Sequence, residues 1–533
     1  MRPQGRAAGL AGRSTVYAPH GVLATSQPLA TAAGLRVLQD GGNAVDAAVT
    51  AAAVLSVVEP HMTGMGGDLF ALMWIQDRGR VVGLDASGRA GSLMTPERLR
   101  ADGHAAVPAS GAGSVTVPGA LAGWSALLES HGTLSLAAAL APAIDLAEHG
   151  FPVTPVIARQ WGAAAAKLAA DAGARTTFLL DGERAPRAGE WFTNSDLARS
   201  LRSVADGGSA VLYGGALGRA LADGVRALGG YLTTDDLAAY RADWVDPISI
   251  AYKGNTVWEI PPAGQGVAAL QMLGMAERFD LAAMGWNSAA YLHTLVELKK
   301  LAFADVAAYV CDREAMEIPV AALLDAGYLA DRAAELDPAR AAERAEPGAP
   351  AVASETIYLA AADRQGNMVS FINSIYEHFG SGVVVPGTGF ALQNRGAGFV
   401  LEEGHPNRVA PGKRPLHTII PAFVTKDGAP WMAFGVMGGP MQPQGHVQVL
   451  LNLIEFGMDP QEAIDAARFR HLAGRRLAVE RIDAETQARL EALGHELVDW
   501  TSTEFGGAQL VIKLERGWAA ASDPRKDGMA AGH

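Results

Sequence analysis

The segment Ser354-Glu355-Thr356-Ile357-Tyr358-Leu359 opens an apolar run that ends at a turn over residues 363–367. One interpretation is simply a threonine at the start of a β-strand. The other is chemical: if the Glu355–Thr356 bond broke, Thr356 would carry a free α-amino group, with an unperturbed pKa of about 8, beside its own hydroxyl. Such an amine can accept the hydroxyl proton and so activate the nucleophile without a histidine or an aspartate.

The composition is that of a large folded protein. The chain has 533 residues, of which 49% are hydrophobic and 19% are charged, so it can bury extensive cores and is not expected to be disordered. Its net charge of -13 disfavours nucleic acid or an anionic membrane as a partner. The single cysteine, Cys311, excludes a disulfide framework or a Cys-based zinc site within the chain, and we expect it to be a packing residue.

The N-terminal sequence argues against export. Between Arg6 and Arg13 lie only six residues, whereas a secretory signal needs about 7–15 apolar ones. The longest apolar run, Ala47 to Val58, is interrupted by polar residues and is too short to span a bilayer. We therefore expect a soluble, cytoplasmic protein without a membrane partner.

Local patterns predict a mixture of helices and strands. Helices are expected over 28–39 and over 44–58, the second capped by Asn43 and buried all round. The glycines of Gly64-Met-Gly-Gly-Asp68 indicate bare backbone that something approaches closely, although no phosphate-loop Lys follows. Residues 338–354 are rich in Ala, Glu, Arg and Pro and predict a mobile tail before Thr356. Further strands are predicted at 21–26, 69–75, 81–84, 251–262, 357–362, 368–373, 390–393, 422–426 and 430–435, with a helix from about 444 to 456.

Several motifs occur in a fixed order over nearly the whole chain. They are Gly41-Gly-Asn-Ala-Val-Asp-Ala-Ala48, Gly64-Met-Gly-Gly-Asp68, Val117-Pro-Gly119, Thr356, Gly366-Asn367-Met-Val-Ser370, Phe379-Gly-Ser-Gly382, Lys413-Arg-Pro-Leu416 and Gly438-Gly439. Together they resemble the γ-glutamyltransferase family of N-terminal-nucleophile (Ntn) hydrolases.

The resemblance implies an α+β fold with four αββα layers, in which two antiparallel sheets lie between helical layers. It also implies a proenzyme that cuts itself between Glu355 and Thr356. The large subunit would be residues 1–355 and the small subunit residues 356–533, and both would form one interleaved domain. The expected assembly is a heterodimer of the two subunits, or a dimer of that pair.

The resemblance also assigns catalytic roles. Thr356 matches the family nucleophile, and Ser374 falls where the family has a hydroxyl that hydrogen-bonds to it. Gly438 and Gly439 match the pair whose backbone N–H groups face the developing oxyanion, where one donor is typically worth about 3–4 kcal/mol. A helix-entry turn is the structural alternative for the glycine pair.

Departures from the family pattern concern the substrate. The arginine expected two residues after Asp85 is Ser87, and an arginine stands two residues further on, at Arg89. Where the family has an acidic residue for the substrate ammonium, this chain has Gly398. The remaining replacements, together with Arg89 the candidate substrate-binding residues, are Tyr376, Arg395, His417 and Thr418.

Relative to the family pattern, a cationic residue has been added and an acidic residue has been lost. These changes favour a substrate with a carboxylate over an α-amino acid. The pattern is similar to the oxamate amidohydrolase-like branch, so we expect an Ntn amidohydrolase acting on a small carboxylate-bearing amide. Arg89 and Arg395 have an alternative role as ion-pair residues. The competing functions are a glutathione hydrolase/γ-glutamyltransferase, an acylase of β-lactam side chains, and an uncut binding or scaffold protein. No cofactor or metal is expected, since the histidines form no HExxH pattern or close cluster in the sequence.

Overall fold

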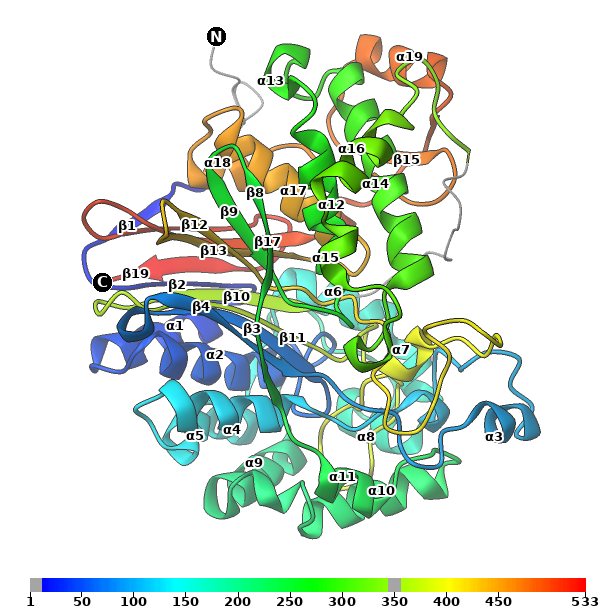
Figure 1. Ribbon diagram of the computed structural model, residues 1–533. Helices are drawn as coiled ribbons and strands as arrows, with labels where there is room; N and C mark the ends of the chain where they lie inside the picture. Colours follow the sequence, from blue (N-terminus) through cyan, green and yellow to red (C-terminus); the bar gives the residue numbers. More distant parts are fainter. Residues whose placement is uncertain (1–11, 344–355) are drawn as a thin grey trace.

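Two seven-stranded sheets packed face to face form the centre of the molecule (Figure 1). The structure is a computed structural model that describes residues 12–343 and 356–533. In the first sheet the strand order is β1 (Val16–Ala18), β18 (Trp518–Ser522), β17 (Gly507–Lys513), β13 (Ala429–Met437), β12 (Ala422–Lys426), β9 (Asn255–Glu259) and β8 (Ile248–Tyr252). In the second it is β19 (Met529–Gly532), β2 (Val22–Thr25), β10 (Ile357–Ala362), β11 (Met368–Ser374), β3 (Asp68–Ile75), β4 (Arg80–Ala86) and β7 (Asp243–Val245).

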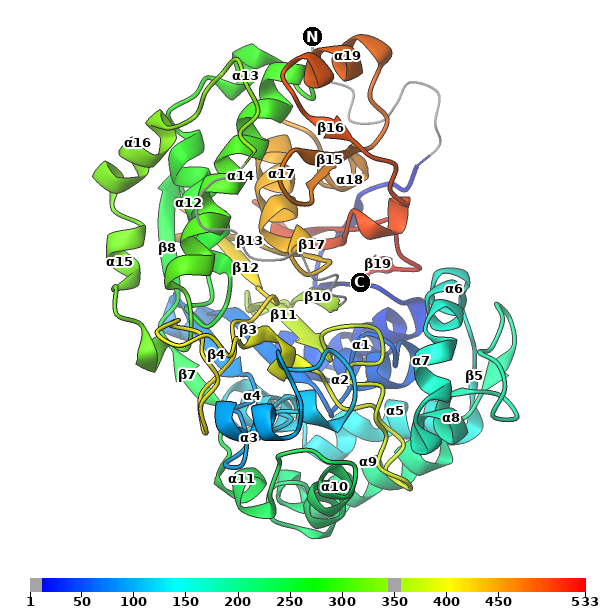
Figure 2. The same ribbon diagram turned by 90° about the vertical axis from the view of Figure 1, so that its right-hand side faces the viewer.

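Helices cover the outer face of each sheet, as both views show (Figures 1 and 2). Against the second sheet lie α1 (Pro28–Gln39), α2 (Ala44–Val58) and α4 (Ala120–His131), and α5 (Leu136–His149) packs on α2. Against the first lie α12 (Gly266–Ala276), α17 (Met441–Ile454) and α18 (Pro460–Asp465), and α14 (Ala289–Tyr309) packs on α12. The predicted four-layer αββα fold is therefore confirmed.

The remaining elements pack around these four layers. The helices are α3 (Pro96–Ala101), α6 (Pro155–Ala163), α7 (Ala165–Ala169), α8 (Ala172–Phe178), α9 (Ser195–Gly207), α10 (Ala216–Ala227), α11 (Thr234–Ala239), α13 (Leu281–Met284), α15 (Val320–Leu323), α16 (Ala326–Ala334) and α19 (Ala484–Ala492). The strands are β5 (Phe151–Pro152), β6 (Trp191–Phe192), β14 (Phe469–His471), β15 (Arg476–Val479) and β16 (Glu496–Leu497).

Alternation along the strands produces three stacked cores. In β10, Tyr358 and Ala360 belong to the core between the two sheets, whereas Leu359 and Ala361 pack under the helices of the second sheet. Successive side chains of a strand point to opposite faces, so both faces of β10 are apolar. This explains why the central strands are continuous apolar runs.

Both sheets combine strands from before and after Thr356. In the second sheet, β10 lies between β2 and β11, and β11 pairs with β3, all antiparallel. In the first sheet, β12 pairs with both β9 and β13. Neither segment alone completes a sheet. Within the described residues, no helix combines the length and apolar character needed to cross a membrane.

Helix α2 follows from its sequence. Asn43 caps it, its side chain accepting from the backbone N–H groups of Val45 and Asp46, and the Asp46 side chain accepts from the Asn43 N–H to complete a capping box. All fifteen residues of the helix are buried. The predicted bounds of both α1 and α2 are confirmed.

Three predicted elements differ from the structure. The single strand expected over 251–262 is a hairpin, β8 and β9, because Lys253 and Gly254 both have positive φ and form a two-residue turn. Residues 390–393 are not a strand, since their backbone bonds go to separate loops, such as Gln393 N–H to the Gly66 carbonyl. Helix α17 begins at Met441, three residues earlier than predicted. Of the tail predicted at 338–354, residues 344–354 lie outside the described part of the chain.

Candidate active site

Three neighbouring strands of the second sheet end in a row of polar residues. Ile357 pairs with Asn373, which places Thr356 opposite Ser374, and Ser374 pairs in turn with Asp68. The Thr356 hydroxyl donates to Ser374 Oγ at 3.1 Å. All three polar side chains are buried.

The row faces the space between the two sheets. Thr356 is two residues from Tyr358, and Asp68 is two residues from Phe70, and both aromatic rings belong to the core between the sheets. Side chains two apart on a strand share a face. The polar row therefore continues the apolar core between the sheets at the ends of β10, β11 and β3.

The glycines before Asp68 allow this close strand packing. A Cβ atom on Gly67 would lie 2.3 Å from the carbonyl oxygen of Ser374, and one on Gly66 would lie 2.3 Å from that of Ala391. Both distances are too short for any side chain. The group that approaches the bare backbone predicted here is the protein's own chain on either side of the row.

Arg395 joins the row from η5 (Arg395–Gly398), a short 3₁₀ turn. Its guanidinium is fully buried, donates from Nη1 to Thr418 Oγ1 at 2.8 Å and from Nη2 to Ser374 Oγ at 3.3 Å, and stacks on the Tyr376 ring at 4.1 Å. Its Nε lies 3.6 Å from Asp68 Oδ2 without forming a hydrogen bond. Burial lowers the pKa of Arg395 to about 10, so the group is cationic at neutral pH.

Asp68 is the carboxylate at the end of the row. Its Oδ1 accepts from Gly88 N–H at 2.7 Å, and its Oδ2 lies 3.0 Å from His417 Nε2. Burial raises the pKa of Asp68 to about 7, and the nearby Arg395 charge and the Gly88 N–H oppose the rise. The carboxyl therefore titrates near neutral pH.

His417 is a neutral donor to Asp68. Burial lowers the pKa of His417 well below its usual value, with Arg395 and Arg414 adding to the shift. Its Nδ1 accepts from Ile419 N–H at 3.4 Å, so the ring proton lies on Nε2 and points at Asp68. Its ring also packs edge-on against Phe70.

The glycine pair is tied to the same group of residues. Gln265 donates from Nε2 to the carbonyls of both Thr418 and Gly439, at 2.6 and 2.9 Å. Gly438 and Gly439 have φ values of 124° and 58°, which side chains rarely permit. Among the described residues, neither of their N–H groups donates to a protein oxygen, so both are available to a ligand.

Tyr376 holds a strained backbone beside the row. Its φ of 81° is rare for an aromatic residue. Its N–H donates to Ser374 Oγ at 2.8 Å. Ser374 thus receives the Thr356 hydroxyl, the Tyr376 N–H and the Arg395 guanidinium, and strain of this kind gathers at functional sites.

Arg89 lies in a different group of charges. It pairs with Glu314 at 3.1 Å, with Asp243 at 3.6 Å and with Asp312 at 3.7 Å, and it donates to the Gly412 carbonyl. None of its contacts among the described residues reaches Thr356 or Arg395. The structure therefore brings together Thr356, Ser374, Tyr376, Arg395, His417, Thr418 and the glycine pair, and places Arg89 among acidic residues instead.

Gly398 leaves no room for an acidic side chain. A Cβ atom there would lie 2.8 Å from the Leu416 carbonyl oxygen. Asn407 holds this backbone by donating to the Gly398 carbonyl at 2.6 Å. The position at which the family resemblance places the ammonium partner is closed by main chain.

Sequence reasoning assigned no role to Asp68 or Gln265. The position of Asp68 directly after two glycines and at the start of a strand was the available signal. Gln265 gave none, because its role depends on two loops distant in sequence. Glu355, the other residue of the expected cleavage site, lies outside the described residues.

Comparisons with known proteins agree with this geometry. The family model for gamma-glutamyltranspeptidase matches residues 30–533. The chain belongs to the γ-glutamyltranspeptidase (γ-glutamyltransferase) family. It is a hydrolase that acts on amide bonds.

Three similar members of the γ-glutamyltranspeptidase family carry different names. A glutathione hydrolase-like YwrD proenzyme from Bacillus subtilis is 38% identical, with 95% of this chain and 97% of that protein covered. An oxamate amidohydrolase proenzyme from Klebsiella pneumoniae is 37% identical, with 98% and 100% covered. The crystal structure of a cephalosporin acylase from Bacillus halodurans superposes with a TM-score of 0.92 at 44% identity, with 99% and 98% covered. The family is thus shared, whereas the named substrates are not.

Proposed function

We propose that this chain is a self-processing amidohydrolase in which Thr356 is the nucleophile and the substrate is a small amide carrying a carboxylate, of the oxamate kind. The observation that carries the proposal is a buried guanidinium, that of Arg395, on the same serine hydroxyl that receives the Thr356 hydroxyl. The oxamate amidohydrolase name of a full-length relative supports this substrate class.

Processing would create the catalytic base. In the intact chain the Thr356 nitrogen is an amide and cannot accept a proton. Cleavage of the Glu355–Thr356 bond would release an α-amine beside the hydroxyl, and would give a large subunit of residues 1–355 and a small subunit of residues 356–533. Several relatives are named proenzymes. The interleaved strands would hold the two subunits together as a heterodimer.

The reaction then needs only groups of this site. The amine takes the proton of the Thr356 hydroxyl while Oγ1 attacks the amide carbonyl, and the N–H groups of Gly438 and Gly439 stabilise the oxyanion. The amine returns the proton to the leaving nitrogen, so that ammonia departs from oxamate and an ester remains on Oγ1. The same amine next removes a proton from water, and the resulting attack on the ester releases the acid and restores the hydroxyl.

Arg395 would orient the substrate. Two of its five N–H donors are used in hydrogen bonds to described residues, and a carboxylate can accept from the rest. Gly398 cannot supply the acidic partner that an α-ammonium needs, because main chain closes that position. The proposal assigns carboxylate binding to Arg395 rather than to Arg89, which acidic residues already engage.

The test of the nucleophile is N-terminal sequencing. Purified protein should give two fragments, the smaller beginning Thr356-Ile357-Tyr358. Thr356→Ala should remain one chain and be inactive, while the matched control Thr356→Ser keeps a hydroxyl and should still be cut. A different new N-terminus, or activity in Thr356→Ala, would overturn the assignment. An uncut wild type would favour a binding or scaffold protein.

The test of the substrate is a panel of amides. Oxamate, γ-glutamyl-p-nitroanilide, glutathione and a cephalosporin would be compared by kcat/KM, with product release as the signal. The proposal expects oxamate-like amides to lead. Faster turnover of the γ-glutamyl compounds would identify a glutathione hydrolase, and faster cleavage of the cephalosporin would identify an acylase. Cytoplasmic location stays a prediction.

A further inference from the structure

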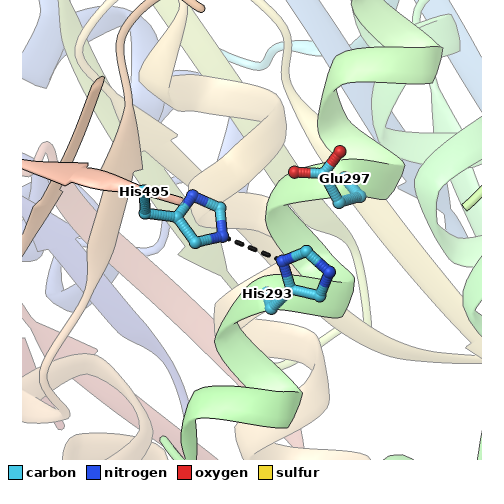
Figure 3. Close-up of side chains that lie close together, drawn as sticks. All are labelled: His293, Glu297 and His495. Atoms are coloured by element: carbon cyan, nitrogen blue, oxygen red, sulfur yellow. Dashed lines mark hydrogen bonds between the residues drawn. The ribbon is translucent and has the colours of Figure 1, made fainter. Parts of the chain in front are cut away.

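Two histidines and a glutamate converge on one another in the helical layer over the first sheet (Figure 3). His293 and Glu297 stand four residues apart on α14, so they share one face of the helix. His495 reaches them from the turn between α19 and β16. One ligand atom from each lies within 4.8 Å of the others, and all three residues are buried.

The two imidazoles are already in, or one proton shift from, the form that binds a metal. His293 Nε2 lies 2.9 Å from the Asp337 carbonyl, which can only accept, so the His293 proton is on Nε2 and Nδ1 carries a lone pair. A backbone carbonyl that fixes the tautomer in this way is the usual partner of a metal-binding histidine. His495 donates from Nε2 to that lone pair at 2.9 Å.

The one lone pair of the His495 ring, on Nδ1, is unused. Its Nδ1 is buried and has no hydrogen-bond partner. Moving the ring proton from Nε2 to Nδ1 would turn the Nε2 lone pair toward His293 Nδ1. A cation placed between the two nitrogens would therefore replace one hydrogen bond with two coordinate bonds, at no cost in protons.

Glu297 supplies the anionic ligand. Its Oε1 accepts from Lys300 Nζ at 2.7 Å, and its Oε2 accepts from Ala342 N–H at 3.1 Å. Each carboxylate oxygen retains a further lone pair.

We propose that His293, Glu297 and His495 form a binding site for a divalent transition metal of the zinc class. Two imidazoles, one carboxylate and a fourth position for water match the ligand chemistry of zinc. Zn–N bonds of about 2.0–2.1 Å require the two nitrogens to open from 2.9 Å to roughly 3.3 Å in a tetrahedral site. That movement is small enough for a side-chain adjustment.

The metal site would join the region of Asp337 and Ala342, which precedes Thr356, to the region of His495, which follows it. Asp337 and Ala342 contact the cluster directly, and Ala341 N–H donates to the Leu493 carbonyl at 2.7 Å. His293 and Glu297 precede Thr356, whereas His495 follows it. If the chain is cut as proposed above, the metal bridges the two subunits, and this one statement rests on the proposed function.

The test is metal binding by tag-free protein stripped of metal. Cobalt(II) serves as the spectroscopic probe, and the metal content after zinc loading is measured by mass spectrometry. The wild type is expected to bind one ion per chain, with visible Co(II) bands of a four- or five-coordinate site. His495→Gln and Glu297→Gln should each lose at least tenfold in affinity. At a hundredfold excess over the wild-type Kd, zinc should raise the wild-type Tm by about 2 °C and the Tm of each variant by no more than about 1 °C.

His471→Gln is the matched control. His471 is equally buried near α14 and hydrogen-bonds to Lys299, but it is not part of the cluster. It should bind metal as the wild type does. Absence of cobalt bands in the wild type, or equal loss in the control, would overturn the proposal. Thr356→Ala should bind one ion even though it stays uncut, so failure of processing and failure of the metal site are told apart.

Discussion

Asp68→Asn tests whether the carboxylate beside the nucleophile costs stability. The unfolded chain should lose the Asp68 proton near pH 3.9, whereas burial in the folded protein raises its pKa to about 7. Between these values the folded protein binds a proton that the unfolded chain has lost. The stability that the raised pKa of Asp68 contributes is therefore fully present below about pH 4 and is lost as the pH rises to about 7.

The size of the effect follows from the shift. About three pKa units at 1.36 kcal/mol each give a loss on the order of 4 kcal/mol between pH 4 and pH 7. Unfolding entropy of about 2.1 cal/mol/K per residue, over 533 residues, amounts to roughly 1.1 kcal/mol/K. The Tm of the wild type should thus fall by about 4 °C relative to Asp68→Asn over this range.

Besides removing the titration, the asparagine adds a cost in stability that does not depend on pH. Asparagine can still accept from Gly88 N–H, but its amide N–H group meets the donors of His417 and Arg395, at a cost of about 1–3 kcal/mol. That cost is the same at every pH. Activity should fall, because Arg395 then lacks its counter-charge.

The assay is thermal unfolding of both proteins from pH 4.5 to pH 8, followed by circular dichroism. Asp523→Asn is the control. Burial alone would raise the pKa of Asp523, but Arg468 and Arg525 hold this pKa below its usual value. Stability from Asp523 is lost only as the pH falls below about 4, so this control should stay parallel to the wild type over the range. The reasoning would be refuted if the wild-type Tm minus the Asp68→Asn Tm stayed constant or increased from pH 4.5 to pH 8, because Asp68 would then be held ionised.

Four further predictions concern catalysis. Ser374→Ala removes the acceptor of the Thr356 hydroxyl and should lower kcat about tenfold with an unchanged circular dichroism spectrum; an undiminished kcat would count against this role. Arg395→Lys keeps the charge but loses the planar fork, so KM should rise for a carboxylated amide and not for its neutral analogue; an equal rise for both would make Arg395 structural. The rate should increase from pH 6 to pH 9 as the Thr356 amine loses its proton, and a rate that only falls would exclude the amine as base. Turnover should survive EDTA well below the Tm, because the proposed steps use only the threonine, its amine and backbone N–H groups, and a loss restored by zinc even in His495→Gln, which weakens the site proposed above, would indicate a metallohydrolase.

Local sequence signals predict the bounds of a helix correctly where its apolar pattern and its boundary residues indicate the same ends. Helices α1 and α2 begin and end where predicted, because Pro28, Asn43 and the apolar periodicity all indicate the same bounds. The loop at 390–393 was misassigned because an apolar run does not reveal its hydrogen-bond partners, here Val383 and Gly66. The turn at Lys253 and Gly254 was overlooked within a run that otherwise suits a strand.

Site geometry was less accessible, since it depends on register between distant segments. Thr356 meets Ser374 only because Ile357 pairs with Asn373, and Asp68 enters through the next strand. The ion-pair partners of Arg89 come from two other parts of the chain, Asp243 and the neighbouring Asp312 and Glu314, so these pairs could not be recognised in the sequence. Likewise, His495 lies 202 residues from His293, and only the fold brings them within hydrogen-bond distance.

The buried charges of Asp68 and Arg395, beside Thr356, are incompletely paired. A buried carboxylate and guanidinium are each expensive to desolvate, and here they stand 3.6 Å apart without a hydrogen bond between them. Arg395 donates hydrogen bonds to the hydroxyl groups of Thr418 and Ser374, and these neutral groups do not balance its charge. We infer that a substrate carboxylate would supply the missing anion, and that the stability lost to these charges is recovered when it binds. A carboxylated inhibitor should then raise the Tm of the wild type more than that of Arg395→Gln, whereas an equal rise in both would place the carboxylate elsewhere.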